Sequence, residues 1–158
     1  GGLTRKERRR ANRTQRNRKR NRLSAPGDEG SIGRKDVLSQ HFLEDETIIT
    51  KFVEAVDDRS KNGACVVELG PGLGALTGPL LERYKDMSAV ELDSQAAGVL
   101  RERFPHLHLV EGSMLDVDFK ALSEKKGGRL TVVGNVPFGI TSALLFKLLD
   151  SAPYIRRI

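Results

Sequence analysis

A glycine-rich loop between a strand and a helix constrains the fold of this chain more than any other feature. Residues 64–69 are almost entirely apolar and predict a buried strand, and apolar side chains recur at helical spacing over residues 76–84. The loop at residues 70–74 reads GPGLG. Glycines at such a place let the backbone approach a ligand closely and direct N–H groups at it. The spacing differs from the G-x-G-x-x-G of a pyrophosphate loop, so the loop alone identifies no ligand.

Strands and helices alternate along the chain. Further apolar strands are predicted at residues 87–91, 107–110 and 130–134. Helices are predicted after an N-cap at Asp45, from Ser94 to about Phe104, and from Thr141 or Ser142 through Leu149. In the first helix the apolar positions recur at helical spacing and are expected in the core; they are Ile48, Ile49, Phe52, Val53 and Val56. The alternation predicts an α/β fold with a parallel sheet.

The predicted strands lead into residues that are suited to bind a ligand. In open α/β sheets, ligands bind outside the carboxyl ends of the strands. We therefore expect one crevice, formed by Gly70, Gly72, Glu91, Ser113 and Asn135. Within it, the carboxylate of Glu91 can accept hydrogen bonds from both hydroxyls of a ribose.

Residues 135–138 read NVPF and offer two acceptors beside an aromatic ring. The side-chain oxygen of Asn135 and a backbone carbonyl near Pro137 can accept both N–H bonds of an exocyclic amine, while Phe138 stacks on the ring that bears it. Acceptors placed for a tetrahedral nitrogen favour the reacting geometry of an amine whose lone pair is otherwise delocalised. The motif indicates N-methylation of a base, although four residues alone are equally compatible with a plain proline turn.

Four segments carry a resemblance to a known family: SQHFL at residues 39–43, ELGPGLGALT at 68–77, AVELD at 89–93 and GNVPF at 134–138. In order and spacing they closely resemble the ribosomal RNA adenine N6,N6-dimethyltransferases, from about residue 37 to the end of the chain. The resemblance implies a Rossmann-like, class I S-adenosylmethionine-dependent methyltransferase fold. It implies S-adenosylmethionine as the methyl donor and two adjacent adenines near the 3′ end of small-subunit ribosomal RNA as the acceptors.

The resemblance also implies a role for each matched residue. The cofactor-binding set is His41, Leu43, Gly70, Gly72, Glu91, Ser113 and Asn135, and the catalytic set is Asn135, Pro137 and Phe138. His41 and Leu43 match positions at the methionine end of the cofactor. Glu91 matches the ribose-binding acid, and Ser113 matches the position that faces the cofactor's adenine amine.

Three matched positions depart from the family's commonest residues. His41 replaces an asparagine, Phe138 replaces a tyrosine, and Ser113 replaces an aspartate. Phenylalanine keeps the stacking face and loses only a hydroxyl. A serine hydroxyl accepts a hydrogen bond less strongly than a carboxylate does, by about 1 kcal/mol, so weaker cofactor binding is expected unless Asp116 substitutes.

The N-terminal segment has a different composition from the rest of the chain. Residues 1–22 hold eleven Lys or Arg and one acid, a net charge of +10, so the remainder carries −4 against the total of +6. With few apolar side chains this segment is expected to be disordered when free, and residues 24–33 are typical of a linker. The composition favours a tail that binds RNA phosphates through residues 5–22; a solvated charge run and a targeting segment are the alternatives.

The expected domain organisation follows from these segments. Residues 1–30 form the basic tail and linker, and residues 31–158 form the N-terminal part of the methyltransferase domain. Four strands are readable, after which the sheet core is truncated, although residues 154–158 resemble the opening of a fifth strand. The helical C-terminal domain of the family is absent from this chain.

Metal and membrane chemistry are not expected. His106 and His108 alternate along the third predicted strand with no partner at metal-ligand spacing, and Cys65 lies alone in an apolar strand. The sequence has no apolar run of the length that crosses a membrane.

Together the motifs predict an enzyme that dimethylates small-subunit ribosomal RNA on the assembling ribosomal subunit. A second hypothesis is a non-catalytic assembly factor or mitochondrial transcription factor that retains the fold, which Ser113 and the missing domain favour. The erythromycin-resistance methyltransferases of the large subunit share these motifs and give a third. The basic tail and Phe138 resemble mitochondrial members, which favours the mitochondrial matrix over a bacterial cytoplasm or a plastid.

Removal of residues 1–22 from the full-length protein should weaken RNA binding and flatten its salt dependence, because most of the positive charge leaves with them. The measurement is an RNA titration at several salt concentrations, read as the log–log slope. A control variant that lacks residues 24–30 should keep the slope of the intact protein. An unchanged slope without residues 1–22 would favour the targeting interpretation.

Overall fold

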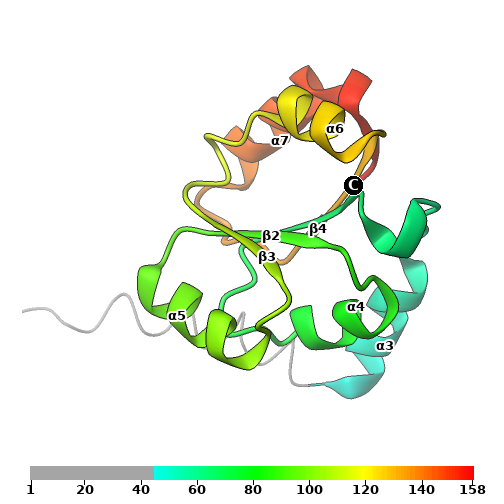
Figure 1. Cartoon of the computed structure of the whole chain (residues 1–158). Coiled ribbons are helices and arrows are strands. Elements are labelled where there is room, and N and C mark those ends of the chain that lie inside the picture. The colour runs from blue at the N-terminus through cyan, green and yellow to red at the C-terminus, as the bar shows by residue number, and fades with distance from the viewer. Residues whose placement is uncertain (1–44) are drawn as a thin grey trace, which may run out of the picture. The chain divides into compact units, whose positions relative to one another are not determined.

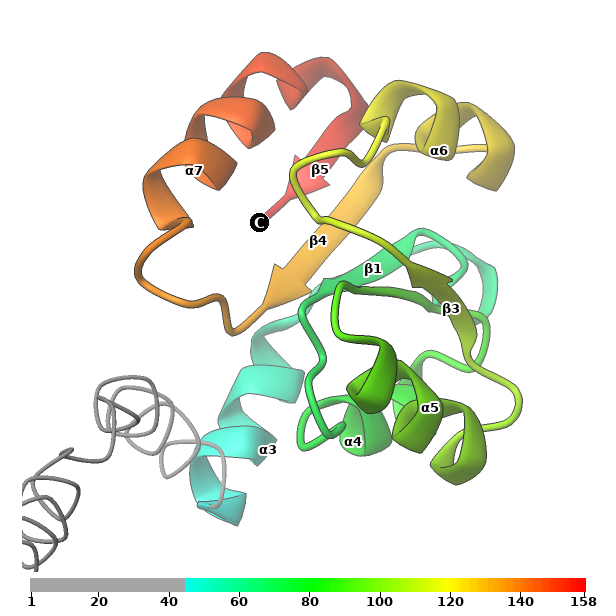
Figure 2. The same ribbon diagram turned by 90° about the vertical axis from the view of Figure 1, so that its left-hand side faces the viewer.

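One parallel sheet forms the centre of the part of the chain that the structure describes. The structure is a computed structural model that describes residues 45–158; the basic tail, His41 and Leu43 lie outside the described residues. The strands are β1 Val66–Leu69, β2 Ser88–Glu91, β3 His108–Glu111, β4 Leu130–Gly134 and β5 Ile155–Arg157. All are parallel and lie in the order β3-β2-β1-β4-β5 (Figures 1 and 2). The predicted α/β parallel sheet is confirmed.

Helices cover both faces of this sheet. They are α3 Glu46–Ala55, α4 Thr77–Arg83, α5 Ser94–Arg103, α6 Phe119–Lys126 and α7 Thr141–Asp150, with short 3-10 helices at Lys61–Gly63 and Ala152–Tyr154. Figure 1 shows α3, α4 and α5 on one face and α6 and α7 on the other. With both faces covered, every residue of β1 and β2 is buried, as is usual for parallel strands.

Each face of the sheet has its own apolar cluster. Leu80 of α4 and Met87 are fully buried beneath α3 and α4, and the hydroxyl of Tyr84 donates to the carbonyl of Val56 at 2.6 Å. On the other face, Phe119 of α6 is 1 % exposed and packs with Leu69 and the inner side of α7. Burial of these side chains stabilises the fold by about 1.5–3 kcal/mol for each large one.

The first helix begins where the sequence predicts but is less buried than expected. The Asp45 carboxylate accepts two backbone N–H groups of the first turn of α3, at 2.8 and 3.4 Å. Val56 is buried, whereas Ile48 is 42 % exposed, and the other stripe residues are half-buried: Ile49, Phe52 and Val53. The expectation of a core position is therefore wrong for Ile48.

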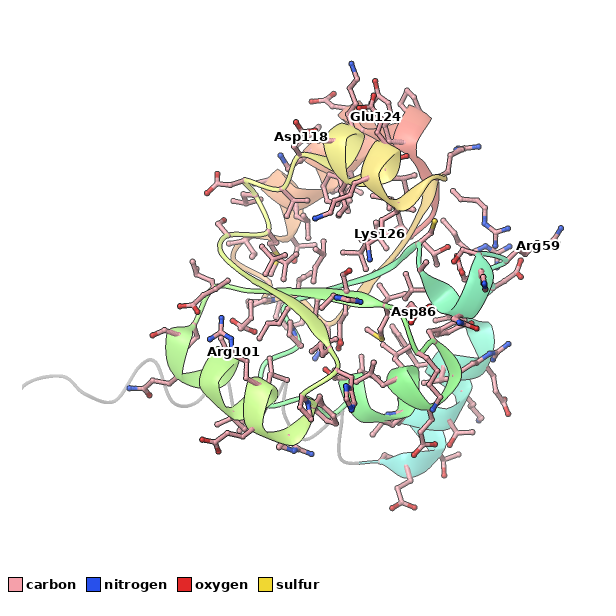
Figure 3. The ribbon with its side chains drawn as sticks, viewed as in Figure 1. Arg59, Asp86, Arg101, Asp118, Glu124 and Lys126 are labelled. Carbon is pink, nitrogen blue, oxygen red and sulfur yellow. The ribbon has the colours of Figure 1, made fainter. Side chains whose placement is uncertain are left out.

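Helix α6 was not predicted, although the sequence carries both of its end signals. Asp118 accepts the N–H of Ala121 at 2.9 Å at the start, and Gly127 ends the helix with φ of 75°. Charged side chains cover its exposed side, including Glu124 (Figure 3). Its few apolar residues give a weak helical period, so hydrophobic periodicity alone does not predict this helix.

The expected opening of a fifth strand is confirmed, because residues 155–157 pair with the first two residues of β4. One strand expectation is wrong. His106 lies in the turn before β3 rather than within it, so only His108 belongs to the strand.

Gly134 at the end of β4 is held against the carbonyl of Leu69 in β1. A Cβ at Gly134 would lie 2.4 Å from that oxygen, and both groups are backbone atoms fixed by the sheet. Substitution of Gly134 with alanine should therefore lower the free energy of unfolding by about 1–3 kcal/mol, measured by urea denaturation.

Substitution of Gly98 with alanine provides the matched control. Gly98 lies within α5, and a Cβ there would meet nothing within 4 Å, so this change should stabilise the protein by about 0.5–1 kcal/mol. Equal stabilities for the Gly134→Ala variant and the wild type would contradict the close approach.

Candidate cofactor and target-base site

Backbone hydrogen bonds bring the carboxyl ends of three adjacent strands together. The N–H of Gly70 donates to the carbonyl of Val90 at 2.9 Å, and the N–H of Gly112 donates to the carbonyl of Glu91 at 2.8 Å. Each bond extends the strand pairing one residue into the loop. On the other side of β1, the pairing of Leu69 with Gly134 places the start of the 135–138 loop at the same edge. The predicted convergence of the strand ends is confirmed for the described residues.

The three glycines of the loop after β1 have positive φ angles that favour glycine. They are 67° at Gly70, 56° at Gly72 and 89° at Gly74. A Cβ at Gly74 would lie 2.6 Å from the ring of Phe104, so this glycine serves the packing of α5. A Cβ at Gly72 would meet nothing within 4 Å, so the backbone there is open to a close ligand.

Glu91 holds the loop in place through its carboxylate. Its Oε2 atom accepts the N–H of Gly72 at 2.9 Å, and its Oε1 atom accepts the N–H of Asp93 at 2.9 Å. The residue is 7 % exposed. A carboxylate has about four acceptor sites, so these two bonds leave acceptor capacity for the two hydroxyls of a ribose. The residues present therefore fit a nucleoside at this position.

Glu68 is a second buried acid beneath the loop, and sequence reasoning gave it no role. It is 1 % exposed, and the Thr77 hydroxyl donates to its Oε2 atom at 2.8 Å. Burial raises the pKa of Glu68 from 4.5 to about 7; the Thr77 hydrogen bond acts in the opposite direction, and the charge of Glu91 adds to the rise. An acidic residue inside an otherwise apolar strand is the signal that could have revealed it.

Ser113 lies in a turn that follows β3. Its Oγ atom accepts the N–H of Leu115 at 3.1 Å, and its carbonyl accepts the N–H of Asp116 at 3.0 Å. The hydroxyl keeps its own proton to donate and one further acceptor site. Asp116 is exposed, and the suggestion that it substitutes for Ser113 stays a prediction.

The loop after β4 presents an open aromatic face. Phe138 is 90 % exposed, and Asn135 is also exposed. The carbonyl of Pro137 accepts two donors, the N–H of Ile140 at 3.2 Å and the hydroxyl of Thr141 at 3.0 Å. Those bonds tie the loop to the start of α7 and use the acceptor capacity of that carbonyl.

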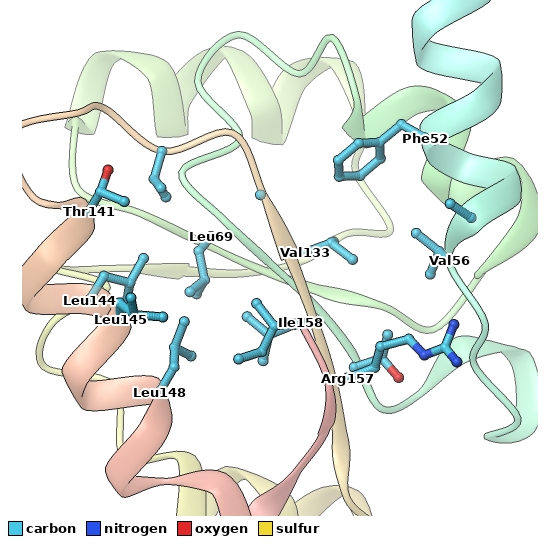
Figure 4. Close-up of a pocket in the computed structure, with 15 residues that line it drawn as sticks. Phe52, Val56, Leu69, Val133, Thr141, Leu144, Leu145, Leu148, Arg157 and Ile158 are labelled. Atoms are coloured by element: carbon cyan, nitrogen blue, oxygen red, sulfur yellow. The ribbon is translucent and has the colours of Figure 1, made fainter.

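An apolar cavity of about 330 Å³ lies beside this loop but on the β4 side, away from Glu91. Figure 4 shows Phe52 and Val56 of α3 on one side of it and Leu144 and Leu148 of α7 on the other. Its wall is almost wholly apolar and includes Leu69 and Gly134, the last residues of β1 and β4. Neither Glu91 nor any residue of the glycine loop lines it. We therefore place the candidate cofactor site at the glycine loop and Glu91 rather than in this cavity.

Other chemistries find little support among the described residues. No group of three or more His, Cys, Asp or Glu side chains in residues 45–158 is placed to hold a metal ion. Within the same residues, every helix is too short or too polar to span a membrane.

The family model for ribosomal RNA adenine dimethylase matches residues 33–158. A ribosomal RNA small subunit methyltransferase A from Leptothrix cholodnii is 42 % identical over 119 residues, which cover 75 % of this chain and 43 % of the relative. The chain spans less than half the length of the curated relatives it matches.

Two solved structures have a similar fold. The crystal structure of the 23S rRNA methyltransferase ErmE aligns with a TM-score of 0.58 and 30 % identity, covering 70 % of this chain and 43 % of that one. A dimethyladenosine transferase from Plasmodium falciparum aligns with a TM-score of 0.56 and 25 % identity, covering 71 % and 39 %.

The buried carboxyl group of Glu68 makes stability depend on pH. The pKa of Glu68 is about 7 in the folded protein and 4.5 in the unfolded chain. Between these pH values the folded protein keeps a proton that the unfolded chain loses, so the free energy of unfolding falls as the pH rises from 4.5 to 7. Glu68→Gln cannot ionise. Between pH 4 and pH 8, the free energy of unfolding of this variant should therefore rise by about 2–3 kcal/mol relative to that of the wild type.

Urea denaturation of the full-length protein across this pH range gives the measurement. Glu124→Gln, which removes an exposed carboxylate from α6, is the control and should follow the wild type. Parallel curves for Glu68→Gln and wild type would show that Glu68 is already ionised when folded.

Proposed function

This chain belongs to the ribosomal RNA adenine dimethylase family, and from that premise we propose that the full-length protein transfers methyl groups from S-adenosylmethionine to N6 of adenines in small-subunit ribosomal RNA. The observation that carries the proposal is the meeting of the glycine loop, Glu91 and the 135–138 loop at one edge of the sheet. The proposed reaction needs a carboxylate that binds the nucleoside of the cofactor and an exposed aromatic ring that stacks on the target base.

The cofactor half consists of the loops after β1, β2 and β3. Glu91 would accept the ribose hydroxyls, and Gly70 and Gly72 would let the backbone approach the ligand. Ser113 would face the adenine of the cofactor, where its hydroxyl can both accept and donate. When bound, S-adenosylmethionine supplies the methyl group on its sulfonium sulfur. His41 and Leu43 are proposed for its methionine end on the resemblance alone.

The target half consists of the loop after β4. Phe138 would stack on the adenine, because its ring is almost fully open to solvent. The Asn135 side-chain oxygen would accept one N–H of the exocyclic amine. Since the Pro137 carbonyl already accepts two donors, we assign the second acceptor to the neighbouring carbonyl of Val136. Two acceptors would hold the amine with its lone pair directed at the methyl group.

The sequence also supports more specific proposals for the substrate and the cellular compartment. Two adjacent adenines near the 3′ end of the RNA would be the acceptors, on an assembling small ribosomal subunit. The basic residues between 5 and 22 would add contacts to RNA phosphates that do not depend on sequence. The mitochondrial matrix is the proposed compartment.

A non-catalytic assembly or transcription factor is the second candidate function. Ser113 favours it, because the neutral hydroxyl offers the cofactor a weaker acceptor than a carboxylate would. S-adenosylmethionine binding separates the two candidates. Full-length wild-type protein that folds and binds no cofactor in calorimetry would support the factor.

Asn135→Ala should lower the single-turnover rate of dimethyladenosine formation by roughly 100-fold or more, with RNA affinity little changed, because the amide acts on the reacting amine. Phe138→Ala should also slow the step, since base stacking is worth ~1–3 kcal/mol. The assay is mass spectrometry of the 3′-terminal fragment of small-subunit precursor RNA.

The exposed Glu124 of α6 supplies a matched control, and Glu124→Ala should react at the wild-type rate. If Asn135→Ala methylates as fast as an active wild type, the assignment of the target-base site is wrong.

A further inference from the structure

Carboxyl groups on two adjacent strands hold the glycine loop through hydrogen bonds. Glu91 of β2 accepts the N–H of Gly72 in the middle of the loop. Glu68 of β1 accepts the hydroxyl of Thr77, the first residue of α4, at the far end of the loop. The loop is therefore fixed at two points by carboxyl groups, and Thr77 and Glu68 are both essentially inaccessible to solvent.

Resting on the proposed cofactor site, we propose that Glu68 is a positioning residue of that site and that its carboxyl group releases a proton to solvent when the cationic cofactor binds. The site would thereby distinguish S-adenosylmethionine, whose sulfur carries a positive charge, from S-adenosylhomocysteine, the uncharged thioether that remains after methyl transfer. Glu68 acts on the ligand through its charge and through the loop that it fixes, without touching the reacting atoms.

The surroundings of Glu68 make its charge sensitive to a nearby cation. Its direct neighbours across the sheet are Ala89 of β2 and Val133 of β4, and neither is charged. From α4 it meets the Thr77 hydroxyl, and from the end of β2 it meets the charge of Glu91. Among the described residues, no cationic side chain is bonded to it. A positive charge that enters the crevice at Gly70, two residues along the chain, would favour ionisation.

The carboxyl group of Glu68 can gain or lose a proton near neutral pH. Burial places the pKa of this carboxyl at about 7, so both forms are populated in the free protein near physiological pH. A cation that lowers this pKa by one unit binds tenfold more tightly to the ionised form. The affinity for the sulfonium cofactor should therefore rise with pH and level off above the pKa of the free protein.

Isothermal calorimetry on the full-length protein tests this, with S-adenosylmethionine and S-adenosylhomocysteine as the ligands at pH 6, 7 and 8. Two buffers that differ in ionisation enthalpy report the protons released. The amino group common to both ligands titrates near pH 8, so the difference between the ligands isolates the effect of the sulfonium. Wild type should bind S-adenosylmethionine about fivefold more tightly at pH 8 than at pH 6, with proton release at pH 6 and 7, relative to S-adenosylhomocysteine.

Three variants separate charge from structure. Glu68→Gln keeps an acceptor for Thr77 and cannot ionise, so its relative affinity for the two ligands should not change with pH. Thr77→Val removes a hydroxyl that lowers the pKa of Glu68, so it should weaken both ligands and move the pH dependence of S-adenosylmethionine binding to higher pH. Thr77→Ser retains the donor and should restore binding. A thermal melt of each variant checks that it is folded.

The outcomes are distinct for the two proposals. Wild type that binds neither ligand at any pH would overturn the proposed function. Wild type that binds both ligands with the same pH profile, and releases no more protons with S-adenosylmethionine than with S-adenosylhomocysteine, would overturn the role of Glu68 alone. That result needs no variant, so it holds even where Glu68→Gln fails to fold.

Discussion

The parallel pairing of β1 with β4 at their carboxyl ends is the contact on which the candidate site depends. β1 lies in the middle of the sheet and is buried along its whole length, so it accepts a strand on each side. At Leu69 the two strands approach so closely that the paired residue, Gly134, has no room for a side chain. This approach sets Asn135 beside the end of β1, from which the glycine loop departs. The relative position of the two halves of the site is therefore a property of the sheet rather than of the loops.

The two acids beside the glycine loop have different surroundings and different tasks. Glu91 accepts backbone N–H groups on both of its oxygens and still has acceptor capacity, so it can shape the loop and bind a sugar at the same time. Glu68 has a single hydroxyl donor and almost no contact with solvent, an environment that penalises its charged form. A fold that needed only a filler at this position would be better served by an uncharged side chain. A carboxyl group at this position is therefore better explained by a ligand than by packing.

The sequence predicts those features that depend on local pattern. The apolar runs of β1, β2 and β4 are continuous because both faces of the sheet are covered, and Asp45 caps α3 through its own side chain. The meeting of the strand ends follows from parallel topology, which the alternation of strands and helices already indicates. Helix α6 was missed because its polar surface weakens the period, and the exposure of Ile48 depends on how far its neighbours extend.

The remaining contacts join residues whose separation along the chain follows no recognisable sequence pattern. The hydrogen bond from Thr77 to Glu68 joins the start of α4 to β1 across the glycine loop. The two donors to the Pro137 carbonyl come from the turn that leads into α7. The roles of Ser113, His41 and Leu43 stay predictions.

The order of strands in the sheet also determines when its parts can form during synthesis. β2 and β3 follow β1 along the chain and pair on one side of it, whereas β4 emerges only after α6. Until then β1, whose four residues are all buried in the complete sheet, has an open edge on a nascent chain that the ribosome releases from its N-terminus onward. The half of the sheet that carries the candidate cofactor site is thus synthesised before the half that would hold the target base. A chain interrupted before β4 would carry the glycine loop and Glu91 on an unprotected edge, which makes such products candidates for chaperone capture or degradation.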